Sequence, residues 1–482
     1  MRRFQKHSLV VARVAAGLLL AVLALSLRQA AHVVSAQTTA PPTAQQQLAR
    51  DILKELIEID TTDEHGDVTR AAEAMAARLR AAGFPSEDVQ VIGPNPRKGN
   101  LVARLRGTGA RRPVLLLAHL DVVEARREDW TFDPFKLTEQ DGYFYGRGTL
   151  DIKEGAANLV ANLIRLKREN FKPDRDLILA LTADEEGGNF NGVDWLLRNH
   201  RDLIDAEFCI NTDAGGGALK DGKPQRFSVQ ASEKIYLSFR LEVKNPGGHS
   251  SLPTRDNAIY HLAEGLARLA RFDFPVRLNE VTRTYFERAA ALEAGQLAAD
   301  MRAVTHAPPD PAAVSRLSAT PYFNALMRTT CVATRLEAGH ADNALPQTAA
   351  ALVNCRLLPD ESPDEVERTL ARVVADPQVK ITRANEPRPA PLSPLKPEIM
   401  RPVERIAAEM WPGAPTIPVM ETGATDGLLL RRAGLDTYGI TGLFIDINDV
   451  RAHGKDERIG VKEFYDDTEF LYRLIKAVSS NS

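Results

Sequence analysis

A histidine and an aspartate, His119 and Asp121, end the apolar run LLLAHLD and are separated by one residue. Alternate residues of a strand point to the same face, so these two side chains should be neighbours. A carboxylate beside an imidazole can fix the tautomer of the ring for metal binding. Taken alone, the pattern is more often explained by a buried histidine followed by a turn aspartate.

A second aspartate, Asp151, stands in GRGTLDIKEG, directly before a predicted helix over residues 155–167. An aspartate in that place often serves only as the helix N-cap. Its carboxylate has two oxygens, however, and can bridge two cations. The segment therefore allows either a cap or a bridging metal ligand.

Two adjacent glutamates, Glu185 and Glu186, follow the apolar run DLILALT in the segment ADEEGG. Adjacent carboxylates in a tight turn repel each other unless a cation offsets their charge. Consecutive extended side chains point in different directions, so one glutamate can bind metal while the other reaches a bound water. A solvated charge pair is the alternative, and the buried strand before the turn disfavours it.

Asp213, after the run FCINT, and His453, in RAHGKDE, complete the set. Either residue alone would be an ordinary turn aspartate or loop histidine. With His119, Asp151 and Glu186 they supply nitrogen and oxygen ligands, mostly at successive strand ends, where open α/β sheets gather ligands. Mixed imidazole and carboxylate ligation suits zinc, with manganese or cobalt as alternatives.

The elements that must position these residues alternate along the chain between helices and short apolar strands. The sequence predicts strands over residues 100–106, 113–118, 176–182 and 208–211, and helices over residues 46–59, 68–82 and 155–167. This rhythm predicts an α/β catalytic domain with a central, mostly parallel sheet flanked by helices.

A different pattern begins near residue 232. Predicted strands over residues 234–243, 327–336 and 349–357 and helices over residues 257–269 and 363–374 come close to a strand–helix–strand–strand–helix–strand order. That order is typical of a small α+β, ferredoxin-like domain. We predict that this domain, residues 232–386, is inserted between catalytic segments at residues 45–231 and 387–482.

The chain has 482 residues, which exceeds the usual size of one core, and its net charge of -3 gives no basic field for nucleic acid. Basic residues near the start precede an apolar run over residues 14–27 and small residues before residue 37. We therefore predict a signal peptide (1–36), a linker (37–44) and a periplasmic or secreted protein without a stable membrane span. An uncleaved N-terminal anchor is the alternative, although bilayer spans need about 20 apolar residues.

Three cysteines, Cys209, Cys331 and Cys355, form neither a disulfide framework nor a CxxC site. Each stands in an apolar or mixed segment. We expect all three to be small buried residues.

Six segments of the chain, in order, resemble motifs of the M20 metallopeptidases, a family of carboxypeptidases, dipeptidases, aminoacylases and deacylases. They are LAHLD, GRGTLDIKEG, ADEEGG, NTDAGG, NPGGHSS and AHGKDE. The resemblance that rests on them extends over nearly all of the chain after the predicted signal. The family often has Lys-Gly-Gly where this chain has Lys153-Glu154-Gly155. That departure leaves the predicted ligands intact.

The resemblance implies two zinc ions per subunit, with Asp151 bridging them. It places His119 and Asp213 on one ion and Glu186 and His453 on the other.

It also implies that Glu185 is the general base and that Asp121 orients His119. Two cations lower the pKa of a shared water, and Glu185 accepts its proton and then protonates the leaving amine.

In the inserted domain, the resemblance implies that His249, Asn343 and Arg356 contact the substrate. His249 would steady the oxyanion, often in a partner subunit's site, so we expect a homodimer through this domain. Arg356 would hold a substrate carboxylate. An exposed turn for His249 and a surface salt bridge for Arg356 are the alternatives, and the loop over residues 422–426 is expected to line the same pocket.

These features predict a binuclear metal-dependent hydrolase that cleaves an amide bond next to a free carboxylate, as a carboxypeptidase or dipeptidase does. An N-acyl-amino-acid deacylase needs the same centre, so the motifs leave that alternative open. An inactive binding protein on the same fold would lack a ligand or the base, and neither is missing. The chain has no G-x-S-x-G elbow and no Walker loop, which disfavours serine hydrolases and nucleotide enzymes.

Overall fold

The computed structural model describes residues 41–480. The predicted signal peptide (1–36) and half of the predicted linker (37–44) therefore lie outside the described residues. A search of the described helices finds none with the length and apolar character that a bilayer span requires.

A ten-stranded sheet forms the centre of the catalytic domain. Its strands are β1 (Val89–Ile92), β2 (Asn100–Leu105), β3 (Val114–His119), β6 (Leu177–Thr182), β7 (Phe208–Asn211), β8 (Gly216–Lys220), β9 (Lys223–Glu233), β16 (Thr416–Glu421), β17 (Asp436–Gly439) and β18 (Phe444–Asp446). They lie in the order β1-β2-β6-β3-β7-β17-β9-β8-β18, with β16 paired to β9. The middle strands β6, β3, β7 and β17 are mutually parallel, which confirms the predicted mostly parallel sheet.

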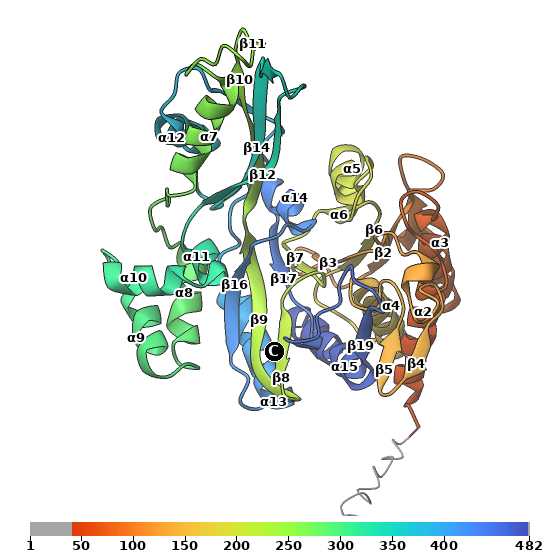
Figure 1. Cartoon of the computed structure of the whole chain (residues 1–482). Helices are drawn as coiled ribbons and strands as arrows, with labels where there is room; N and C mark the ends of the chain where they lie inside the picture. Colours follow the sequence, from red (N-terminus) through yellow and green to blue (C-terminus); the bar gives the residue numbers. More distant parts are fainter. Residues whose placement is uncertain (1–40, 481–482) are drawn as a thin grey trace, which may run out of the picture. The chain divides into compact units, whose positions relative to one another are not determined.

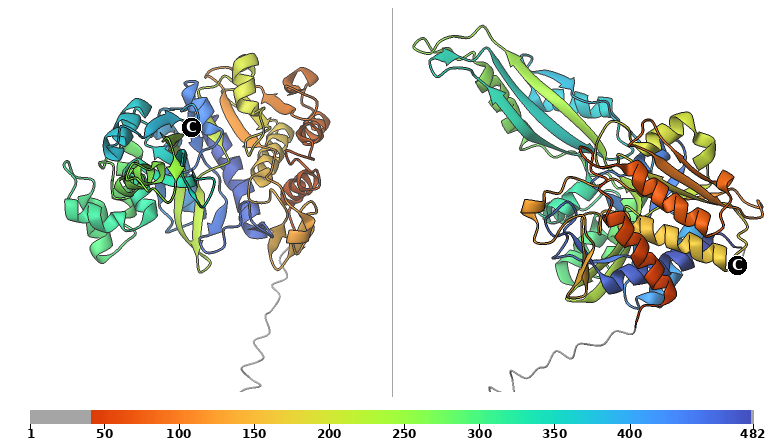
Figure 2. Two further views of the ribbon diagram at one scale, coloured as in Figure 1. Left: turned by 45° about the horizontal axis from the view of Figure 1, so that its top comes forward. Right: turned by 90° about the vertical axis from the view of Figure 1, so that its right-hand side faces the viewer.

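Helices cover both faces of this sheet. One face packs against α2 (Ala44–Ile57), α3 (Val68–Ala81), α4 (Lys153–Arg168), α13 (Pro397–Met410) and α15 (Val461–Val478), and the other against α5 (Gly192–Asn199), α6 (Arg201–Ile204) and α14 (Gly427–Arg432). Figure 2 shows α2, α3 and α4 side by side, in red to yellow. Along β3, Leu116 and Ala118 enter the first core and Leu115 and Leu117 the second. A strand buried on both faces reads as a continuous apolar run, which is why LLLA carries no polar residue.

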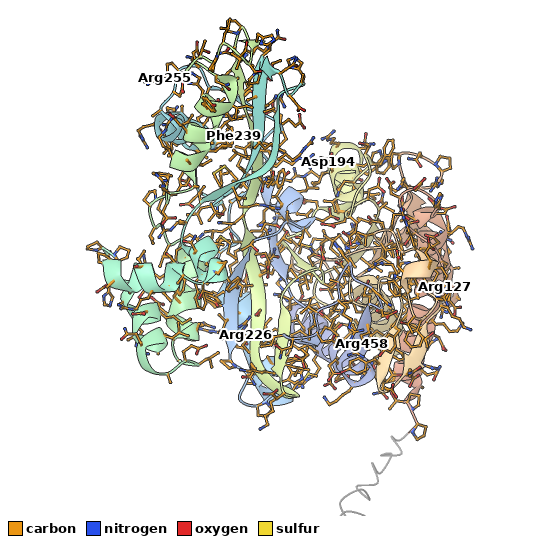
Figure 3. The ribbon with its side chains drawn as sticks, in the orientation of Figure 1. Arg127, Asp194, Arg226, Phe239, Arg255 and Arg458 are labelled. Atoms are coloured by element: carbon orange, nitrogen blue, oxygen red, sulfur yellow. A yellow bond between two sulfur atoms is a disulfide. The ribbon has the colours of Figure 1, made fainter. Side chains whose placement is uncertain are left out.

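The inserted domain has the predicted element order. It contains β10 (Ile235–Lys244), α7 (Ala258–Leu269), β12 (Thr330–Ala338), β14 (Thr348–Leu357), α12 (Pro363–Val374) and β15 (Lys380–Arg383). Its antiparallel sheet runs β12-β14-β10-β15, with α7 and α12 packed together (Figure 1), and this confirms the ferredoxin-like arrangement. Phe239 of β10, labelled in Figure 3, is fully buried in the core of this domain.

Four helices interrupt the inserted domain, a feature that the element order did not predict. They are α8 (Glu280–Ala289), α9 (Gly295–Ala303), α10 (Pro311–Ser318) and α11 (Pro321–Met327). Their apolar residues, including Val281, Phe286 and Met301, join the main core of the catalytic domain, and α8 contacts β16. The chain thus returns to the catalytic domain within the range 232–386. The predicted boundaries themselves stay a prediction.

The remaining described elements are short. They are the 3-10 helices η1 (Ser86–Asp88) and η2 (Arg127–Asp129), the pair β11 (Gly248–His249) and β13 (Ala344–Leu345), and a sheet of β4 (Thr138–Gln140), β5 (Tyr143–Tyr145) and β19 (Arg458–Gly460).

The expectation for the cysteines was wrong for two of the three. Cys331 on β12 lies directly opposite Cys355 on β14, and the two form a disulfide. Their separation of 24 residues carries no signal by itself, because the strand register decides which side chains meet. Cys209 is buried and free, as expected.

Candidate metal centre

Three neighbouring parallel strands bring predicted ligands to one edge of the sheet. His119 is the last residue of β3, Glu185 and Glu186 follow β6, and Asp213 follows β7. These strands adjoin in the order β6-β3-β7, so their carboxyl ends meet at the same edge. Strand pairing thus brings these four side chains close together.

His119 presents one ring nitrogen to this edge. Its Nδ1 lies 3.0 Å from the backbone carbonyl of Asp121, which can only accept, so Nδ1 carries the proton. Its Nε2 lies 3.3 Å from Asp151 Oδ1 and 3.8 Å from Asp213 Oδ1. This nitrogen is buried without a hydrogen-bond partner among the described residues. Its lone pair is therefore free for a ligand.

Asp151 lies between the two predicted histidines. Its Oδ1 faces His119, and its Oδ2 lies 3.0 Å from His453 Nε2. His453 Nε2 is also 2.8 Å from Glu186 Oε1. The N-cap of α4 is Ile152, without a side-chain capping bond, so the capping alternative for Asp151 is wrong. One carboxylate oxygen for each histidine is the arrangement that a bridging ligand needs.

The donors fit divalent cations. Ligand atoms of His119, Glu185 and Asp213 lie within 4.8 Å of one another, and so do those of His119, Asp151 and Glu186. The orphaned Nε2 of His119 and the crowding of carboxylates are both relieved by a bound cation. Imidazole and carboxylate donors suit zinc, manganese or cobalt.

The electrostatics of the protein groups point the same way. Burial raises the pKa of Asp213 well above its usual range and that of Glu185 to about 8. A hydrogen bond to Asp151 raises the pKa of His453 to about 9. Asp213 and His453 therefore hold protons that metal binding would release, since metal ligands must be deprotonated.

Asp121 acts mainly on the glutamate turn. Its Oδ1 accepts a hydrogen bond from the backbone N–H of Glu185 (3.1 Å) and its Oδ2 from that of Glu186 (2.9 Å). The same carboxylate is 3.6 Å from His119 Nδ1, beyond hydrogen-bond range. The ring is thus oriented by the carbonyl of Asp121, while its carboxylate holds both glutamates in place.

Sequence reasoning missed a buried lysine that supports this turn. Asp184 has a left-handed backbone with φ of 57°. Residues other than glycine adopt this conformation at a cost in free energy. The Oδ1 of Asp184 accepts from Lys98 Nζ at 2.5 Å, and Lys98 also donates to Asp63 at 2.7 Å. Lys98 stands in no motif, so only the tertiary structure identifies it.

A buried ion pair ties the His453 loop to the Asp151 segment. Arg147 Nη1 lies 2.5 Å from Glu457 Oε2 and its Nη2 donates to the carbonyl of His453 at 3.3 Å. Glu457 Oε1 accepts from the backbone N–H groups of Leu150 at 2.7 Å and Asp151 at 3.0 Å. Both partners lie within quoted motifs, GRGTLD and AHGKDE, but their pairing across 310 residues has no local signal.

A second ion pair joins residues on either side of His453 in sequence. Arg458, labelled in Figure 3, donates to Asp449 at 2.6 and 2.9 Å and to the hydroxyl of Tyr145 at 2.7 Å. His453 itself has a φ of 61°, so its backbone also needs outside support.

A cavity of about 500 Å³ opens on the centre. Its lining includes Asp151, Glu185, Glu186, Asp213 and His453. As expected for the loop 422–426, the stretch 423–425 lines it too. The other lining residues are Leu150, Ile152, Glu154, Thr212, Ala214, Gly215, Glu421, Thr441, Leu443, Ile445, Val450 and Ala452.

The predicted substrate residues of the inserted domain lie apart from this lining. Arg356 is half-buried on β14, packs over the Tyr236 ring at 4.7 Å, and is 3.5 Å from the Thr422 carbonyl. It forms no salt bridge with a described residue, which removes the surface ion pair alternative. His249 and Asn343 are exposed, and the backbone N–H of Ser250 donates to the Asn343 carbonyl at 3.0 Å. Neither lines the cavity.

Comparisons with known proteins identify relatives of this chain. The model of peptidase family M20/M25/M40 matches residues 115–477. A probable carboxypeptidase S-like 2 of Dictyostelium discoideum is 30% identical over 378 residues, which cover 76% of this chain and 71% of the relative. The human N-fatty-acyl-amino acid synthase/hydrolase PM20D1 is 29% identical over 377 residues, which cover 76% of this chain and 74% of the relative.

Solved structures show the same fold. The M20 family metallo-carboxypeptidase Sso-CP2 from Sulfolobus solfataricus has a TM-score of 0.66 at 18% identity, over 89% of this chain and 99% of that chain. A dinuclear metal-binding peptidase of the M20 family from Bacillus subtilis has a TM-score of 0.58 at 12% identity, over 90% of this chain and 98% of that chain. The chain therefore belongs to the peptidase family M20/M25/M40, whose members are metal-dependent hydrolases of amide bonds.

Proposed function

We propose that this protein is a binuclear metal-dependent carboxypeptidase or dipeptidase that cleaves an amide bond next to a free carboxylate. The observation that carries the proposal is the position of Asp151, with one oxygen toward His119 and the other toward His453. Glu185 lies beside this centre, and Arg356, which forms no salt bridge with a described residue, would pair with a substrate carboxylate.

In this proposal two zinc ions would be held by Asp151, between the sites, together with His119 and Asp213 for one ion and Glu186 and His453 for the other. When bound, the ions would make a water molecule more acidic and offset developing negative charge. Manganese or cobalt would suit the same donors.

Glu185 then moves the proton. Its carboxylate accepts a proton from the attacking water and later donates it to the nitrogen of the leaving amine. Asp121 fixes the backbone of the base through the 3.1 Å hydrogen bond. Burial raises the pKa of Glu185, which suits a group that must take up and release a proton near neutral pH.

The two adjacent glutamates offer a matched test. Glu185→Ala should keep its metal and lose about 10²–10⁴-fold in kcat, whereas Glu186→Ala should lose metal as well. Metal content is measured by elemental analysis and activity on dipeptides with added zinc. Near-normal hydrolysis by Glu185→Ala would contradict the proposed base.

A second candidate function is hydrolysis of N-acyl amino acids. It is favoured by the similarity to N-fatty-acyl-amino acid synthase/hydrolases and by the apolar part of the cavity, Leu443, Ile445 and Val450. A panel of dipeptides, longer peptides and N-acyl amino acids, assayed with each metal, decides between the two.

We also propose that the protein is exported to the periplasm or secreted. The disulfide between Cys331 and Cys355 supports this location, since disulfides persist in oxidising compartments. Cell fractionation of the full chain, with mass spectrometry of its mature N-terminus, tests both export and cleavage of the signal. Intact, cytoplasmic protein would contradict the proposal.

A homodimer through the inserted domain completes the proposal. Its support is the edge strand β12, on which Val332 and Leu336 are 60% and 66% exposed, and the absence of His249 from the cavity lining. Mixing inactive Glu185→Ala and His249→Ala chains under proven subunit exchange should restore part of the activity if His249 serves a partner's site.

A further inference from the structure

Glu154 is a buried carboxyl group with no assigned role. It stands in the first turn of α4, three residues after Asp151, is 1% exposed, and lines the cavity of the metal centre. Its Oε2 has no hydrogen-bond partner among the described residues. A buried acceptor without a donor destabilises the fold, so a donor from outside the chain would stabilise this carboxyl group.

The neighbouring Asp467 shows how this fold satisfies a buried carboxylate. Asp467 is also fully buried, and it accepts from Asn158 Nδ2 at 2.7 Å, from Thr441 Oγ1 at 2.9 Å and from the backbone N–H of Gly442. Glu154 receives no such set of donors. Burial raises the pKa of Glu154, and the charge of Asp467 raises it further. An ammonium group placed beside this carboxyl would favour its ionised form, because an opposite charge lowers a carboxyl pKa.

The charge of the cavity indicates which donor would enter. Six lining residues are acidic, and among the described lining residues His453 alone is basic. Two divalent ions would offset four of the six negative charges. When they are ionised, the three acids outside the proposed ligand set, Glu154, Glu185 and Glu421, leave the loaded cavity with a net negative charge. Such a cavity favours a positively charged substrate group over a neutral acyl chain.

We infer that Glu154 is a specificity residue that binds a protonated amine of the substrate beside the scissile bond. This inference rests on the proposed amide hydrolysis at the metal centre, and it selects among its substrates. Preferred substrates would be zwitterionic, with a carboxylate for Arg356 and an ammonium group for Glu154. The amine belongs either to the residue before the scissile bond or to a basic side chain after it.

Three substrates separate these sources. Alanyl-leucine carries the amine before the bond, propionyl-leucine is the same molecule without it, and propionyl-lysine carries an amine after the bond. The metal-loaded wild type should prefer one amine-bearing substrate over propionyl-leucine by at least about tenfold in kcat/KM. Glu154→Gln should reduce that preference about tenfold at unchanged metal content.

Glu421→Gln is the matched control, because Glu421 is a second cavity acid outside the proposed ligand set and has Arg226 as a neighbouring charge. It should reduce the preference much less than Glu154→Gln. Equal effects of the two variants would show that the total charge of the cavity sets the preference. That result would overturn the assignment of Glu154 as a specificity residue.

Calorimetric binding of alanyl-leucine, propionyl-leucine and propionyl-lysine to metal-loaded Glu185→Ala, with and without Glu154→Gln, gives a readout that needs no turnover. A tenfold weaker affinity for the amine-bearing ligand alone supports the assignment. Equal losses for all three ligands, or a loss of metal from Glu154→Gln, would overturn it. Wild-type enzyme that cleaves none of the substrates would contradict the proposed function, while the binding measurement would still test Glu154.

Discussion

The candidate metal centre has two halves that are held in different ways. His119 and Asp213 follow adjacent parallel strands, and their side chains are 1% and 12% exposed. Glu186 and His453 belong to loops, and the side chain of His453 is 52% exposed. We call these the strand-end half and the loop half, with Asp151 between them.

The two halves differ in the contacts that position their ligands. Backbone hydrogen bonds between β3 and its neighbours set the positions of the strand-end half. The His453 loop depends on two ion pairs. Arg147 and Glu457 are 310 residues apart in sequence, whereas Arg458 and Asp449 close the loop itself. Losing one such contact should disturb His453 more than the strand-end half.

Removing one histidine from each half gives the largest expected effect. His119→Ala and His453→Ala should each lower kcat by about 10³-fold or more, since a lost metal removes several kcal/mol of stabilisation. Added imidazole should restore activity to His453→Ala, because that position is open to solvent, and not to the buried His119→Ala. Equal rescue of both variants would show that the halves do not differ in access.

Breaking the Arg147–Glu457 ion pair should have a smaller effect on the metal centre than removing a histidine ligand. Glu457→Gln leaves the buried Arg147 without its counter-charge, so we expect a loss of about 3–5 kcal/mol in unfolding free energy and about 10–100-fold in metal affinity. Denaturant unfolding and metal titration measure the two quantities. Exposed Glu469→Gln, which pairs with Arg165 at the surface, is the control and should change neither.

Removing the disulfide changes a part of the protein that belongs to neither half of the metal centre. Cys331→Ser together with Cys355→Ser should lower stability by about 3 kcal/mol, the chain-entropy value for a loop of this size. Metal affinity should stay unchanged, because β12 and β14 belong to the inserted domain. A loss of metal in this variant would mean that the inserted domain helps to hold the centre.

A pH test addresses the junction between the domains and has the smallest expected effect. Lys234 lies between β9 and β10, is fully buried, and donates to the Arg328 carbonyl at 2.7 Å. Burial lowers its pKa to about 7. Above pH 7 the folded state releases this proton while the unfolded state keeps it, so stability should rise with pH by about 1.4 kcal/mol per unit.

Lys234→Met isolates that contribution. The stability of wild type relative to this variant should increase from pH 7 to pH 9, as measured by denaturant unfolding. A difference that stays constant or falls over this range would show that Lys234 keeps its charge in the folded state.

Much of the fold and of the candidate centre could be predicted because the signals are local. An apolar strand followed by a polar residue, as in LLLAHLD, is visible within fewer than ten positions of the sequence. Parallel pairing then brings the ends of such strands together at one edge of the sheet. The ferredoxin-like order of the inserted domain could also be predicted from local strand and helix patterns. The helices α8–α11 were not predicted, and amphipathic spacing alone would not have shown which of the two domains they cover.

The sequence by itself determined which residue types stand at the strand ends, and hence the chemistry of the strand-end half. Only the tertiary structure decided how Asp121 divides its carbonyl and carboxylate between His119 and the glutamates, and that Cys331 meets Cys355. It also decided that Glu457 joins the two motifs and that Glu154 is left without a donor. The reason is physical: strand ends are set by hydrogen bonds between neighbouring strands, while these contacts depend on register and on packing across hundreds of residues.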